Sequence, residues 1–76
     1  MKQLVEVMAA ALVEHPESVE VSEKVSGNTT VIELRVDPSD MGKVIGKQGR
    51  IAKAMRTLLK AQAMKLNENV VLEILD

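Results

Sequence analysis

The chain contains no cysteine and no Phe, Trp or Tyr, and this absence constrains its fold more than any other feature. Its 76 residues are expected to make one small domain spanning residues 1–76. A domain of this size buries only about 60% of its unfolded surface, and here neither a disulfide nor a thiolate-bound metal can add stability. The core must therefore be built from Val, Leu, Ile, Met and Ala, and a second chain would supplement so small a core.

Hydrophobic periodicity predicts six elements in the order α-β-β-α-α-β. Pro16, the turn Ser26–Thr29 and Pro38 separate the apolar segments, and Ser39 or Asp40 is expected to cap the helix that follows. The expected elements cover residues 2–14, 18–26, 30–37, 40–45, 49–65 and 70–75.

This order predicts an α+β fold with a three-stranded mixed sheet and helices packed on one face. The hairpin makes the first two strands antiparallel, and the helical crossover makes the third strand parallel to the second. The long helix over residues 49–65 is amphipathic. The residues expected on its core face are Ile51, Met55, Leu58, Leu59, Gln62 and Leu66.

Charge is segregated along the chain. Seven of its ten basic residues and none of its eleven acidic residues lie between residues 41 and 67. This basic segment contains the turn Gly46–Gly49, between two predicted helices. The amides of Lys47, Gln48 and Gly49 would lie at the N-terminus of the long helix, where unpaired amides and the helix dipole favour an anion. The pattern predicts a phosphate-binding turn.

The basic side chains allow two interpretations. Lys43, Lys47 and Arg50 are nearest the turn and are expected to act on an anionic ligand. Lys53 and the basic residues that follow it on the same helix, Arg56 and Lys60, form either a solvated helix face or further phosphate contacts. Lys65 is expected to complement the dipole at the helix C-terminus.

The sequence argues against an enzyme. There is no phosphate loop of the form GxxxxGK[ST], no cysteine nucleophile and no cluster of metal ligands, so neither a cofactor nor a small-molecule substrate is expected. The single histidine, His15, precedes a proline, where contact with the last helix carbonyls or exposure to solvent is expected. The apolar run Val7–Val13 is too short to span a membrane, which favours a cytoplasmic protein.

The run Val44–Ile51 resembles the Ile-Gly-x-x-Gly-x-x-Ile signature of KH RNA-binding domains, with the second isoleucine early and Ala52 where many KH domains have Ile. The element order resembles the type II, bacterial arrangement of that fold. The length of the chain and the segment Asp40–Arg50 are similar to those of the small single-KH bacterial proteins of the KhpA family.

This resemblance implies an RNA chaperone or post-transcriptional regulator that clamps single-stranded RNA. It also implies a homodimer, or a heterodimer with a larger KhpB (Jag or EloR)-like protein. Ile45 and Ile51, with Ile32 and Leu34 of the second strand, would form an apolar groove for bases. The RNA-binding residues implied are Lys43, Ile45, Gly46, Lys47, Gln48, Gly49, Arg50, Ile51 and Lys53.

Without aromatic rings, bases cannot stack on side chains, which predicts little sequence selectivity and micromolar affinity, or about −8 kcal/mol. The alternative function is a protein-interaction module that recruits a larger KH-containing partner and makes only weak RNA contacts. Its contacts would come from surfaces rich in Ala and Met, such as those at Met8–Ala11 and Ala61–Met64.

Overall fold

The computed structural model describes residues 1–75, and Asp76, the last residue of the predicted domain, lies outside the described residues. The predicted order of elements is confirmed, and their ends differ from the predictions by at most two residues. The helices and strands are α1 (Lys2–Leu12), β1 (Glu20–Ser26), β2 (Thr29–Arg35), α2 (Met41–Ile45), α3 (Arg50–Lys65) and β3 (Asn69–Leu75). Short 3-10 turns are η1 (Pro16–Ser18), η2 (Pro38–Asp40) and η3 (Lys47–Gly49).

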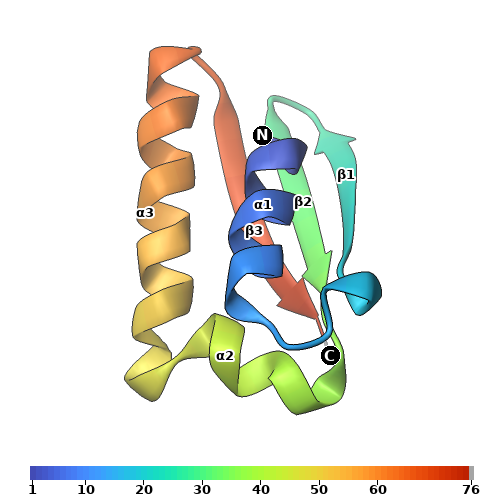
Figure 1. The fold of residues 1–76 in the computed structure, drawn as a ribbon. Helices are drawn as coiled ribbons and strands as arrows, with labels where there is room; N and C mark the ends of the chain where they lie inside the picture. Colours follow the sequence, from blue (N-terminus) through green and yellow to red (C-terminus); the bar gives the residue numbers. More distant parts are fainter. Residues whose placement is uncertain (76) are drawn as a thin grey trace.

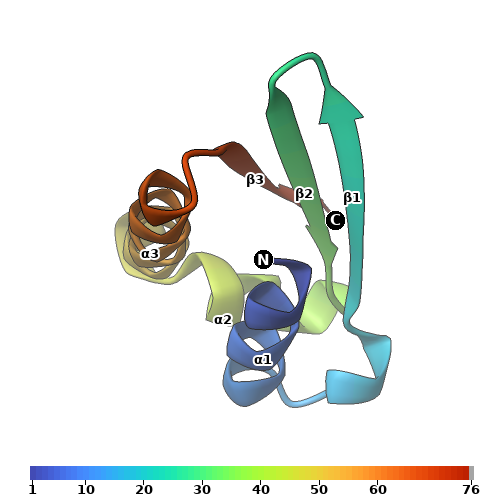
Figure 2. The ribbon, with the colours of Figure 1, turned by 90° about the horizontal axis from the view of Figure 1, so that it is seen from above.

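The three strands form one mixed sheet in the order β1-β2-β3. β1 and β2 are antiparallel, while β2 and β3 are parallel with Ile32 opposite Leu72. All three helices lie on the same face of this sheet (Figures 1 and 2). The predicted architecture is therefore confirmed, including the parallel crossover through the α2–α3 pair.

The core is aliphatic and centres on β2. The alternation of this strand buries Ile32 and Leu34 completely, and Val36 follows them inward. Each such side chain contributes about 1.5–3 kcal/mol on burial. Residues from every helix and from β3 complete the buried cluster: Val5, Ala9, Val44, Met55, Leu59 and Leu72.

The predicted core face of α3 is confirmed at Met55 and Leu59 and is wrong at Leu58, Gln62 and Leu66. The side chains that α3 buries are Ala52, Met55, Leu59 and Ala63. Leu58 and Leu66 are 57% and 51% exposed, and Gln62 is exposed as well. Two alanines allow the helix backbone to approach the sheet closely, whereas an argument from amphipathicity gives weight to large side chains and overlooks Ala.

Candidate nucleic-acid interface

The turn between α2 and α3 requires glycine at its first position. Gly46 has φ +77°, and a Cβ atom there would lie 2.6 Å from Cγ1 of Ile51. Gln48 and Gly49 also have positive φ, of 57° and 73°. Ile51 packs against the core, so the backbone of Gly46 lies directly against a side chain that is held in place. The sequence therefore produces an exposed, tightly bent loop at the end of the molecule where α2 meets α3 (Figure 1).

The turn offers fewer free amides than the sequence suggested. The amide of Gly49 donates to the carbonyl oxygen of Gly46 at 3.1 Å, so it is used within the turn. The amides of Lys47 and Gln48 lie in the first part of η3, where the turn itself supplies no carbonyl for them, so neither has a hydrogen-bond partner within the turn. The expected set of three amides is thus reduced to two.

Three predicted site residues are brought together on the solvent side of the turn. Lys47, Gln48 and Arg50 are all exposed, and Nη2 of Arg50 donates to Oε1 of Gln48 at 3.1 Å. Lys53 is exposed one turn further along α3, and Ile45 is 36% exposed beside the turn. These side chains can present two or three positive charges to one anionic strand.

Lys43 is placed differently from the other basic residues near the turn. Its Nζ lies 3.7 Å from a carboxylate oxygen of Glu14 and 3.7 Å from one of Asp40. Two carboxylates therefore compensate its charge, and it has less positive potential to offer a phosphate than Lys47 has.

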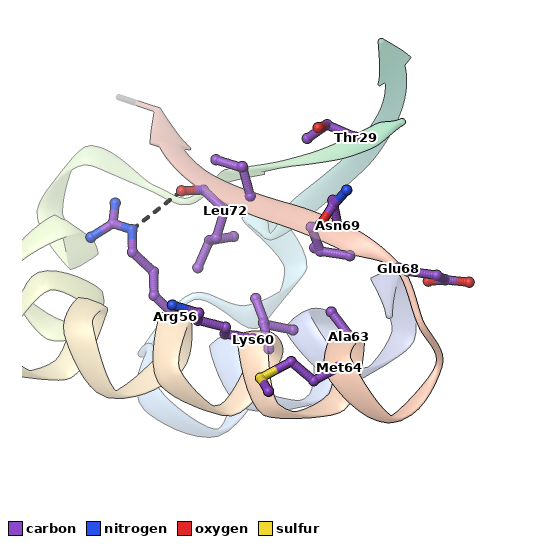
Figure 3. A pocket seen from close by; sticks show the side chains of 11 residues that line it. Thr29, Arg56, Lys60, Ala63, Met64, Glu68, Asn69 and Leu72 are labelled. Carbon is purple, nitrogen blue, oxygen red and sulfur yellow. Dashed lines mark hydrogen bonds between the residues drawn. The ribbon is translucent and has the colours of Figure 1, made fainter. Parts of the chain in front are cut away.

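The expected groove wall on β2 is wrong. Ile32 and Leu34 have no exposed surface, because α1 and α3 cover that face of the central strand. The structure instead has a groove of about 510 Å³ between α3 and β3 (Figure 3). Its lining comprises the apolar residues Leu59, Ala63, Met64, Val70, Val71 and Leu72 and the polar residues Thr29, Arg56, Lys60, Glu68 and Asn69.

Sequence reasoning missed this groove because it depends on the phase of α3. The rotation that turns Ala63 inward also brings Arg56 and Lys60 to the side of the helix that faces β3. Nε of Arg56 donates to the carbonyl oxygen of Leu72 at 3.3 Å. Four basic residues of α3 are therefore divided in pairs, with Arg50 and Lys53 near the turn and Arg56 and Lys60 at the groove.

Asp40, immediately before α2, is a buried carboxylate that the sequence predicted only as a possible helix cap. It is 1% exposed and accepts hydrogen bonds from the backbone amides of Glu14 and His15, at 3.3 and 3.0 Å. Nδ1 of His15 lies 3.0 Å from the same carboxylate. The expected contact of His15 with helix carbonyls is therefore wrong, and the pair instead joins the end of α1 to the start of α2.

The capping prediction also needs correction. The side chain of Asp37 caps η2 by accepting from the backbone amide and the hydroxyl of Ser39, at 2.9 and 2.7 Å. Asp40 makes no cap for α2, because both of its oxygens face the end of α1.

The His15–Asp40 contact changes both pKa values. The hydrogen bond to Asp40 raises the pKa of His15 above 6.5, although desolvation opposes the change. Burial alone would raise the pKa of Asp40, but the amides of Glu14 and His15 and the imidazole outweigh it and lower this pKa below 3.8.

Residues 1–75 contain neither a cluster of metal ligands nor a membrane-spanning helix. Over that range no three His, Cys, Asp or Glu side chains gather in a way that could hold a metal ion. No helix in the described part of the chain has the length and apolar character needed to cross a membrane.

Comparison with known families identifies the fold. The family model for the KH domain of KhpA and KhpB matches residues 2–74. The chain belongs to the KhpA/KhpB KH-domain family. This confirms the family resemblance drawn from the run around Gly46–Gly49.

Relatives within this family match over nearly the whole chain. It is 57% identical over 75 residues to the RNA-binding protein KhpA of Clostridium perfringens, covering 99% of this chain and 100% of the relative. It is also 57% identical over 76 residues to the KhpA of Halalkalibacterium halodurans, with 100% of both chains covered. These KhpA/KhpB-family relatives are named for RNA binding and not for a reaction. RNA binding is also the class of function that the sequence favoured over catalysis.

A solved structure supports the same fold assignment. A variant of Era from Aquifex aeolicus superimposes with a TM-score of 0.62 and 26% sequence identity, covering 96% of this chain and 28% of the Era chain. The order of elements and the mixed sheet are those of the type II KH fold.

Proposed function

We propose that this member of the KhpA/KhpB family is a cytoplasmic, non-enzymatic RNA-binding protein that clamps single-stranded RNA at the turn Gly46–Gly49. The observation that carries the proposal is the exposed turn, in which Lys47 and Arg50 flank two amides without partners in the turn. Relatives with 57% identity are named as RNA-binding proteins, which supports the choice of ligand.

In this mechanism the RNA backbone lies on the turn and the bases extend along α3. The amides of Lys47 and Gln48 and the charges of Lys47, Arg50 and Lys53 face the phosphates. The glycines keep side chains away from the strand. Bases then reach the groove between α3 and β3, where aliphatic side chains replace the aromatic rings that the chain lacks.

A double substitution in the turn tests this function. Lys47→Asp with Gln48→Asp places two carboxylates where phosphates would lie, so we expect RNA binding to be lost. Both side chains are exposed, so the melting temperature should change little. Binding is measured by fluorescence anisotropy with short single-stranded RNA.

The chain provides a matched control for this test. Lys2 and Gln3 are the same two residue types, are exposed, and lie in α1 at the opposite end of the molecule (Figure 1). Lys2→Asp with Gln3→Asp makes the same change in charge and should retain RNA binding. Undiminished binding by the folded variant at the turn would refute the clamp.

Association with a second chain is the other candidate function, either as a homodimer or with a KhpB-like partner. The observation that favours it is the exposure of large apolar side chains on α3. Leu58 is 57% exposed, and Met64, at the groove beside β3, is 73% exposed. Exposed apolar side chains of this kind can be covered by another protein.

Sedimentation tests the association. Wild-type protein should show a mass near twice 8.3 kDa at micromolar concentration, and Leu58→Lys should lower it toward that of one chain. A wild-type protein that remains strictly monomeric, both alone and after mixing with cell extract, argues against the interaction.

A further inference from the structure

The groove between α3 and β3 contains a guanidinium group that is only partly used. β3 is an edge strand, with β2 on one side only, so some of its backbone carbonyls point away from the sheet. Nε of Arg56 donates to one of them, that of Leu72, at 3.3 Å, and the side chain extends from α3 across to β3 (Figure 3). This hydrogen bond holds the planar group at the edge of the groove.

The terminal nitrogens of Arg56 remain available. A guanidinium carries five N–H donors, and Nε uses one of them. No acceptor among residues 1–75 bonds Nη1 or Nη2 of Arg56, and no carboxylate of that range forms an ion pair with it. The group therefore presents a fork of parallel N–H donors whose orientation is set by its bond to Leu72.

A fork of two parallel donors is satisfied by two adjacent acceptors. Guanine presents such a pair, O6 and N7, whereas adenine presents an acceptor beside a donor at the corresponding edge. The lining of the groove is largely apolar, and without aromatic residues its affinity for a base grows with the base area it covers, which favours a purine.

We propose that Arg56 is the base-discriminating residue of this site and that it selects guanine over adenine in the groove. The inference rests on the proposed function, since it concerns an RNA strand that the turn already holds. It gives the site a source of selectivity that does not need stacking on an aromatic ring.

The experiment uses five-nucleotide oligouridines with one guest base, guanine or adenine, at each position in turn. Comparing two purines cancels the effect of size. Wild-type protein should bind the best guanine oligomer about tenfold more tightly than its adenine counterpart. Replacing that guanine with 7-deazaguanine removes the N7 acceptor and should abolish most of the difference.

Two variants separate the effect of the paired N–H donors of Arg56 from the effect of positive charge. Arg56→Lys keeps the positive charge but loses the planar pair of donors, so the guanine-to-adenine ratio should fall to about one. Lys60→Gln removes a charge from the same groove and should weaken both oligomers equally while the ratio stays as in wild type. A merely structural role for Arg56 would change the melting temperature without moving this ratio.

The possible results distinguish failure of RNA binding from failure of the role assigned to Arg56. If no oligomer binds to wild-type protein, the proposed function itself fails. If the oligomers bind and wild type does not prefer guanine, or if Arg56→Lys retains the full preference, RNA binding stands and the role of Arg56 is overturned.

Discussion

At the scale of single residues, Gly46 determines whether the turn can form. Its backbone conformation is costly for any other residue, by about 1–3 kcal/mol, and an added Cβ atom would clash with Ile51. Gly42, which lies within α2, has open space around the position of a Cβ atom. A side chain can therefore be accommodated at position 42 but not, without displacement of Ile51, at position 46.

We expect Gly46→Ala to lower the free energy of unfolding by about 1–3 kcal/mol, because the new methyl group must displace Ile51 and the backbone is strained. Gly42→Ala is the control and should raise stability by up to about 1 kcal/mol, since alanine is the better helix former. Urea denaturation of both variants measures these changes, and equal effects of the two would contradict the geometry of the turn.

At the scale of elements, the rotation of α3 decides what the basic segment can do. Because Ala52 and Ala63 face the sheet, the helix packs closely and its leucines divide, with Leu59 buried and Leu58 exposed. The same rotation brings Arg56 to β3. A different phase would bury Leu58 and turn the groove-lining cations toward solvent.

Adjacent leucines in α3 give a direct test of this phase. Leu59→Ala should cost about 2–5 kcal/mol, since it leaves a cavity in the core. Leu58→Ala should cost less than about 1 kcal/mol, because that side chain is 57% exposed. Thermal or urea unfolding measures both, and similar losses at the two positions would mean that the helix has the phase first inferred from its amphipathicity.

At the scale of the whole molecule, the His15–Asp40 pair joins α1 to the α2–α3 unit and makes stability depend on pH. The raised pKa of His15 contributes stability that is complete below pH 6.5 and is lost as pH rises through the folded-state pKa. The lowered pKa of Asp40 contributes stability above pH 3.8 that is lost as pH falls through its folded-state value.

The free energy of unfolding should therefore decline as pH rises from about 6 to about 8, through deprotonation of His15. His15→Gln has no such group and should show a flatter profile over this range. NMR titration of the single histidine provides an independent readout: its pKa should lie above 6.5 in wild type and near 6.5 in Asp40→Asn. An unshifted wild-type pKa would mean that the contact does not form in solution.

The sequence predicted features that depend on neighbours along the chain. Alternation in β2, the breaks at Pro16 and Pro38 and the glycine turn are local, and they predicted the element order, the sheet and the Gly46–Gly49 turn. Part of the core face of α3, the groove wall and the role of Asp40 were predicted wrongly, because each depends on the distance between elements remote in sequence. Ile32 and Leu34 illustrate this. Their alternation in the sequence predicts that they point to the same face of the sheet, but it does not predict that helices cover that face.

The sequence by itself determined an aliphatic α+β domain with a basic glycine turn, because backbone freedom and hydrophobic period are properties of short segments. Only the tertiary structure decided which of the basic side chains are available. It pairs Lys43 with two carboxylates, leaves Lys47 and Arg50 at the turn, and holds Arg56 on the edge of β3. The physical reason is that a charged side chain can bind a ligand only to the extent that other groups of the protein do not already compensate its charge. Which groups lie near it is determined by the packing of the whole chain.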